Sequence, residues 1–442
     1  MLHQLLFLII YTWLLALVPF SPFVGALLYH WIDNLPPDDV YSVTLIPGYL
    51  SFVTGALTFL TWIVREKKTL PRPPLIILLM IALLVWENVT WCFALVPAAG
   101  AFEWDRTVKV IGFAILTAQM LYTRERLEAF VWVFVLCVIY FGVPGAIKFI
   151  VSGGSGGIAE GETIVAASLS FFGDRVTFSV VLAMAVPFAL YLGRRATLLP
   201  HRWLRLVKPA MFGVVVSCFL ALIGTFARTA LFAGGATLLM MTVRSQRKIV
   251  SFLVAGVMVS ALYMIAPQNW FGRMDTIGDY ETEDSAASRI AAWKWAWAFT
   301  LEHPIVGGGF GVFVLDAGSI TGRPGWLEAH NIVFSTMAKH GFVGLGLFCL
   351  LILAIYRSCA VIQKRVLQRE ELAWAADLAR ATQIALVTFA AGGMFVSIDG
   401  TPALYMLGGI TVGVRDLIER ELTASKRKRI PIPARAIVQP AE

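Results

Sequence analysis

The chain has 442 residues with a net charge of +8; 58% are hydrophobic, only 14% are charged, and the mean hydropathy is +0.76. Soluble domains carry about 25% charged residues, so this composition excludes an ordinary soluble protein and indicates an integral membrane protein. The apolar stretches are long and continuous. They therefore exclude the alternating strands of a membrane β-barrel and predict an all-α polytopic bundle.

Twelve membrane spans are expected in chain order. Their approximate bounds are Leu5–Leu28, Thr44–Val64, Leu75–Leu95, Val108–Tyr122, Leu127–Phe149, Phe178–Leu192, Ala210–Phe226, Thr229–Val243, Ile249–Ile265, Gly341–Tyr356, Thr382–Ser397 and Leu404–Ile418. With a cytoplasmic N-terminus, most of the 36 Lys and Arg residues fall in cytoplasmic loops, as the positive-inside rule requires. We therefore expect a multi-pass protein of a bacterial inner membrane with both termini in the cytoplasm.

These spans divide the chain into four parts. Residues 1–265 are expected to form an N-terminal transmembrane bundle of about nine spans, and residues 266–340 a large periplasmic loop with short helices. Residues 341–418 would form the C-terminal transmembrane helices, and residues 419–442 a basic cytoplasmic tail on the anionic leaflet.

Three arginines on the expected outer side are candidates for binding an anion. Arg228 lies between two apolar runs joined by almost no loop (GTFARTALFAGG). It either extends to lipid phosphate or holds a phosphate-bearing ligand with its forked guanidinium. Arg289 begins an amphipathic helix that contains Trp293, and Arg175 follows Asp174. For both of these arginines, a local ion pair with a neighbouring acid is the alternative.

His330 and Asn331 precede an apolar helix in the sequence EAHNIVFSTMAKHGFVGLGLF. A helix N-terminus disfavours the imidazolium, so we expect His330 to stay neutral and able to accept a proton. A purely structural histidine is the alternative. Glu328 could orient His330 or act by itself, and the tryptophans around Trp293 suit an interfacial position or a wall that faces a sugar.

Other chemistries find little support in the sequence. The glycine run at 307–311 lacks the Lys-Ser/Thr pair of a phosphate-binding loop, and no cluster of His, Cys and carboxylates has zinc spacing. The five cysteines lie in or beside apolar runs and are expected to be small core residues. We expect no metal, no cofactor and no nucleic-acid partner.

Three motifs together resemble the O-antigen ligase and polymerase superfamily. They are Thr225 with Arg228; Arg289 with Trp293, followed by Pro304, Gly307, Gly309 and Phe313; and His330 with Asn331, followed by Gly341 and Gly344. The opening of the chain is similar to the subgroup of exosortase-A-associated O-glycosylation ligases. The chain departs from the family pattern at Ala227, where the family often has Ser, and at Lys339, where an acidic residue is common.

The resemblance implies a membrane glycosyltransferase of the GT-C type, acting in lipopolysaccharide biosynthesis. Such an enzyme transfers a glycan from undecaprenyl pyrophosphate to a hydroxyl acceptor, here lipid A core, at the periplasmic face, with inversion and without a metal. Arg228, Arg289 and, less strongly, Arg175 would bind the pyrophosphate, and His330 would be the catalytic general base. Asn331, Glu328 and Trp293 would support His330.

Alternatives remain at this stage. An O-antigen polymerase and a protein O-oligosaccharyltransferase would share these motifs, because acceptor choice depends on the shape of the cavity. A transporter of lipid-linked sugars is a third hypothesis, but such proteins are typically built from inverted repeats, and we find none in the sequence.

Overall fold

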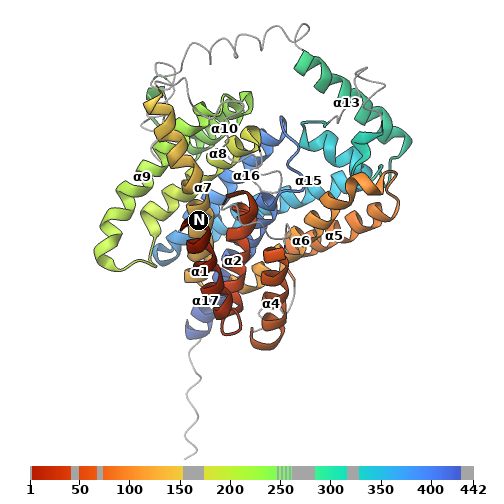
Figure 1. Ribbon diagram of the computed structural model, residues 1–442. Helices are drawn as coiled ribbons and strands as arrows, with labels where there is room; N and C mark the ends of the chain where they lie inside the picture. Colours follow the sequence, from red (N-terminus) through yellow and green to blue (C-terminus); the bar gives the residue numbers. More distant parts are fainter. Residues whose placement is uncertain are drawn as a thin grey trace, which may run out of the picture.

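The computed structural model describes residues 2–40, 49–66, 73–152, 174–245, 284–315 and 328–429, together with a few positions between 248 and 260. All regular structure in these residues is helical (Figure 1), which confirms the predicted all-α class. The predicted span Ile249–Ile265 lies largely outside the described residues, and the basic tail beyond Arg429 lies wholly outside them.

Five of the described helices are long and apolar enough to cross a membrane, so the expectation of twelve spans was wrong for the part of the chain that can be tested. They are α5 (Leu75–Cys92), α7 (Arg124–Val151), α8 (Arg175–Arg195), α9 (His201–Gly224) and α15 (Ile332–Val366). Five such helices confirm a polytopic membrane protein, since a span needs about 20 apolar residues.

Proline and short length explain several of the missing spans. The predicted span Leu5–Leu28 is divided into α1 (Leu2–Leu17) and α2 (Pro22–Asn34). Pro19 and Pro22 lie at this division, and proline removes a backbone donor and disfavours helix in the residue before it. Both α4 (Tyr49–Arg65) and α10 (Arg228–Arg244) have only 17 residues.

Charged residues interrupt the remaining candidates. Helix α6 (Pro97–Met120) is long, but Glu103, Asp105, Arg106 and Lys109 lie within it. Helices α16 (Ala373–Gly393) and α17 (Pro402–Arg429) also contain acidic and basic residues. The shorter described elements are α3 (Pro37–Val40), α13 (Asp284–Glu302) and the 3-10 turns η1 (Val312–Val314) and η2 (Glu370–Leu372).

Helix α8 is the most enclosed of the five long apolar helices, and it packs against α7, α9, α10 and α16. Helix α15 packs between α5 and α16, and α13 lies across its beginning. In the view of Figure 1, α10 and α13 lie toward the upper end of the bundle, whereas α17 runs to the lower end. The elements that carry Arg228 and Arg289 are therefore at the end opposite to the C-terminal part of α17.

Candidate active site at the start of α15

Asn331 fixes the beginning of α15. Its Oδ1 accepts hydrogen bonds from the backbone N–H groups of Val333 (2.9 Å) and Phe334 (3.3 Å), and its Nδ2 donates to the carbonyl of Met394 (3.0 Å). The first two bonds form a helix N-cap. The third joins α15 to the end of α16, so the residue before the cap has a defined position.

That residue is His330, and its backbone φ is +45°. The left-handed region is uncommon for residues other than glycine, so its neighbours must hold it there. Trp293 of α13 supplies one such contact, because its Nε1 donates to the carbonyl of Ala329 (2.6 Å) and its ring stacks on Phe334. Trp293 therefore lies against the backbone beside His330.

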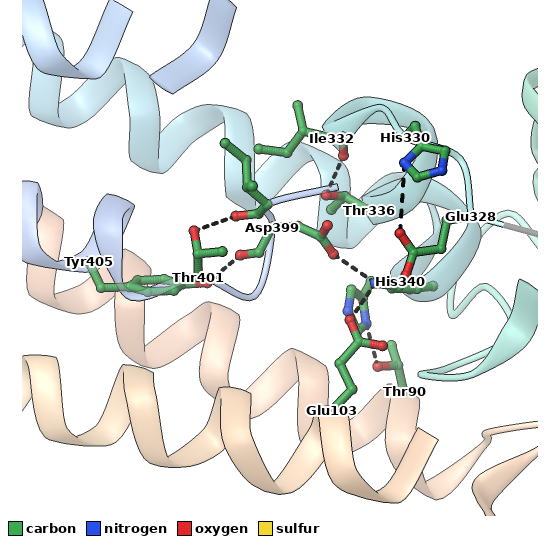
Figure 2. Close-up of polar contacts among 12 residues, drawn as sticks. Thr90, Glu103, Glu328, His330, Ile332, Thr336, His340, Asp399, Thr401 and Tyr405 are labelled. Carbon is green, nitrogen blue, oxygen red and sulfur yellow. Dashed lines mark hydrogen bonds and ion pairs between the residues drawn. The ribbon is translucent and has the colours of Figure 1, made fainter. Parts of the chain in front are cut away.

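The surroundings of His330 favour its neutral form. Burial lowers the pKa of His330, the Arg289 guanidinium lowers it further, and the Asp174 carboxylate acts in the opposite direction. His330 Nδ1 also lies 3.9 Å from Glu328 Oε2, as Figure 2 shows, and both side chains are partly exposed. The structure thus brings Arg289, Glu328 and Asp174 together around His330.

Asp174 belongs to the beginning of α8, where it caps the helix by accepting from the backbone N–H of Thr177 (2.6 Å). Arg175, the next residue, is therefore also near the start of α15. The same cap shows that Asp174 bonds to the helix backbone, a contact that the sequence had not predicted.

Arg228 is the first residue of α10 and lies two residues after Phe226, which has a φ of +51°. One turn further along, Phe232 stacks on Phe395 at 4.1 Å between ring centroids. Phe395 is next to Met394, the partner of Asn331. This chain of contacts sets the start of α10 on the same side of the bundle as the start of α15.

The glycine run at 307–311 has a structural role that its sequence did not reveal. Helix α15 is broken at Gly341, which has φ +67° and ψ −174°. Three backbone hydrogen bonds join the break to the loop before η1: Gly308 N–H to Ala338 O (2.9 Å), Gly309 N–H to Lys339 O (2.9 Å) and Phe342 N–H to Pro304 O (2.8 Å). The loop therefore replaces helical hydrogen bonds that Gly341 interrupts.

Sequence reasoning missed a buried ion cluster below His330. Lys339 Nζ contacts Glu103 Oε1 (2.5 Å) and Asp399 Oδ2 (3.1 Å), joining α15 to α6 and to the loop before α17. Burial raises the pKa of Glu103. Burial alone would also raise the pKa of Asp399, but the Lys339 ammonium lowers this pKa, and the net shift is downward. The signal in the sequence was a single lysine in an apolar helix, whose partners lie too far along the chain to be recognised.

Within the described ranges, no three His, Cys, Asp or Glu side chains gather in the way that metal ligands do. The residues around His330 are instead an imidazole, carboxylates and a guanidinium at the starts of helices. Such a group can move a proton and bind an anion.

Residues 212–349 match the family model described as O-Antigen ligase, and residues 2–197 match a family of unknown function (DUF5935). The first match includes Arg228, Arg289 and His330. No curated protein matches the chain significantly.

The chain is thus a multi-pass membrane protein whose residues 212–349 are similar to the O-antigen ligase family. This similarity points to an enzyme of the glycosyltransferase type that acts on lipid-linked glycans.

Proposed function

We propose that this protein transfers a glycan from undecaprenyl pyrophosphate to a hydroxyl of lipid A core at the periplasmic face, as an inverting, metal-independent glycosyltransferase of the GT-C type. The main support is the position of His330 beside Arg289, within the residues that match the ligase family. The opening of the chain further supports placing it among the exosortase-A-associated O-glycosylation ligases.

His330 acts as the general base in this proposal. Its pKa is lowered by burial and by Arg289, so the imidazole is neutral near pH 7. Glu328 faces Nδ1, favouring a proton on that nitrogen and leaving Nε2 to accept the proton of the acceptor hydroxyl. As that proton leaves, the acceptor oxygen forms a bond to the anomeric carbon from the face opposite the pyrophosphate.

The departing pyrophosphate takes the electron pair of the broken C–O bond. Arg289 and Arg228, with Arg175 as a further candidate, offset the negative charge that develops there. The N-termini of α8, α10 and α15 add partial positive charge on the same side of the bundle. Asn331 and Trp293 hold the His330 backbone in place.

The orientation of α15 supports a periplasmic site. His330 precedes this helix, whereas Lys364 and Arg365 lie in its last turn. Basic residues prefer the cytoplasmic side, so the His330 end would face the periplasm. In this proposal residues 266–340 supply the catalytic loop, between the N-terminal bundle (1–265) and the C-terminal helices (341–418), and residues 419–442 anchor the cytoplasmic end.

The direct test is substitution of the reacting groups. We expect His330→Ala and Arg289→Ala to reduce glycan transfer by at least about a hundredfold, the usual scale for losing a general base or a charge-stabilising group. Expression and membrane insertion should persist. His3→Ala and Arg365→Ala, which lie outside the site, serve as matched controls. Wild-type transfer by either site variant would contradict the assigned roles.

A second experiment identifies the acceptor. Purified protein and lipid-linked glycan are combined with lipid A core, with a serine-bearing protein, or with neither. Transfer to lipid A core supports the proposal. Transfer only to the protein would make the chain a protein O-oligosaccharyltransferase, and lengthening of the lipid-linked glycan would make it a polymerase.

A further inference from the structure

A cavity of about 240 Å³ lies next to Glu328 and therefore close to His330. It is lined by α6, the η1 turn, the first part of α15 and the loop before α17. Its polar lining consists of Glu103, Arg106, Glu328, Ser335, Lys339 and Ser397. Of these residues, only Glu328 has a role in the transfer step itself.

Several polar atoms of this lining are buried and have no hydrogen-bond partner among the described residues. They are Ser335 Oγ, Ser397 Oγ, and Nε and Nη2 of Arg106. Ser335 is only 1% exposed. A buried donor or acceptor without a partner is unfavourable, and such groups in native proteins commonly bind a ligand or water. Their convergence on one cavity indicates a ligand that carries several hydroxyl groups.

The charges of the cavity narrow the class of ligand. Lys339 is already paired with Glu103 and Asp399, so its charge is not available to a second anion. Glu328 adds another carboxylate at the side nearest His330. The Glu328 carboxylate disfavours a pyrophosphate group, but carboxylates, serine hydroxyls and a guanidinium together match the donors and acceptors of a neutral sugar.

The rest of the lining is apolar, with Phe102 and Phe313 among its residues. Aromatic side chains suit the C–H faces of a sugar ring, whose hydroxyls point outward toward polar groups. The volume is small compared with pockets for drug-sized ligands, which occupy about 300–1,000 Å³. A single sugar ring fits this size and chemistry better than an extended glycan does.

We propose that this cavity binds the terminal sugar ring of the acceptor and presents one of its hydroxyls to His330. This assignment rests on the transfer function proposed above, because a general base must reach the acceptor hydroxyl. The reacting sugar of the donor fits less well, since its pyrophosphate would be drawn close to the Glu328 carboxylate. Ser335, Ser397 and Arg106 thereby contribute to acceptor recognition.

Kinetics with separately varied substrates test this assignment. Ser335→Ala and Ser397→Ala should each raise KM for the acceptor by up to about tenfold, the scale of one hydrogen bond, while KM for the donor stays unchanged. Neither change should harm folding, because each removes a hydroxyl that has no partner among the described residues. Ser179→Ala is the matched control, since Ser179 is buried but bonds within α8 and does not line the cavity.

A rise in KM for the donor, or no change in either KM, would overturn the assignment to the acceptor.

A binding measurement that needs no glycan transfer separates this inference from the proposed function. Saturation-transfer NMR is performed on the purified full chain with methyl glycosides of glucose, galactose, mannose and N-acetylglucosamine. We expect at least one to bind, the signal to persist in His330→Ala, and the signal to weaken in Ser335→Ala with Ser397→Ala.

Absence of binding by all four glycosides, or a signal that the double serine variant retains, would reject the sugar cavity. Sugar binding by a protein that transfers no glycan would instead reject the proposed function and leave the sugar cavity in place.

Discussion

The left-handed backbone of His330 costs roughly 1–3 kcal/mol, a strain that persists only where surrounding contacts impose it. The Asn331 cap on one side and the Trp293 bond to the Ala329 carbonyl on the other supply these contacts. Both come from residues beside the imidazole, not from the imidazole itself. The side chain of His330 is therefore left free for chemistry while its backbone is fixed.

The pH dependence of transfer should report the charges around His330. The neutral imidazole is present above its pKa and is lost as the pH falls through it, so the acidic limb of kcat/KM follows this pKa. Because Asp174 raises the pKa of His330, Asp174→Asn should move that limb to lower pH. Asparagine also caps helices well, so α8 should remain intact.

Asp105→Asn is the control for this measurement, because Asp105 forms an exposed ion pair with Lys109 and does not contribute to the pKa of His330. If the acidic limb of the kcat/KM profile stays in place in Asp174→Asn, or moves to higher pH, His330 is not the titrating base.

Individual site residues were predictable to different degrees. The sequence predicted that an apolar helix begins after His330 and Asn331, and α15 begins there, with Asn331 as its N-cap. The ion pair of Lys339 was not predictable, because Glu103 lies 236 residues away in the chain. Local patterns reveal caps, whereas a contact between distant helices depends on packing that a single sequence does not display.

At the scale of elements, α15 consists of two helical pieces joined at Gly341. The sequence predicted a span that begins at this residue, and the break occurs there. A helix before the break was also expected, because His330 and Asn331 precede an apolar helix in the sequence. What could not be predicted are the hydrogen bonds that the loop at 304–309 makes to the broken helix. The 35 residues of the merged helix exceed the roughly 20 that a span needs, so the first piece is available to carry the site.

Substitution of Gly341 should therefore be costly. Its φ of +67° with ψ of −174° is a conformation that essentially only glycine adopts, and a Cβ there would meet the carbonyl of Ile305. We expect Gly341→Ala to lower the free energy of unfolding by about 2–4 kcal/mol, seen as a lower Tm in detergent.

Gly346→Ala is the matched control in the same helix, because a Cβ at this position meets nothing within 4 Å. Alanine favours helix over glycine, so this variant should be as stable as the wild type or slightly more stable. Equal stability of the two variants would show that the break at Gly341 does not matter.

For the whole molecule, the sequence predicted the all-α class and the membrane setting but overestimated the number of spans. Each apolar run was treated as a separate crossing, although α10 has 17 residues and α6 contains four charged side chains. Whether a short or charged helix crosses the membrane depends on the neighbours that cover it. Composition alone cannot supply that information.

The proposed orientation can be tested by labelling introduced cysteines in cells. In a variant whose five native cysteines are replaced by alanine, Glu302→Cys and Glu370→Cys provide exposed positions in α13 and η2. A membrane-impermeant maleimide should label the first in cells with a permeabilised outer membrane and the second only after the inner membrane is opened. Equal labelling of both, or the reverse order, would overturn the periplasmic placement of the site.

The joint between the glycine run and the break at Gly341 limits how this protein can be recombined with its relatives. The loop at 304–309 supplies hydrogen bonds that α15 lacks at its break, so each segment depends on the other for backbone hydrogen bonds. A chimera that exchanges only one of them would keep these backbone bonds only if the incoming segment adopts the positive-φ conformations of Gly309 and Gly341. Engineering of acceptor choice should therefore transplant residues 284–345 as one cassette, together with compensating changes at Glu103 and Asp399.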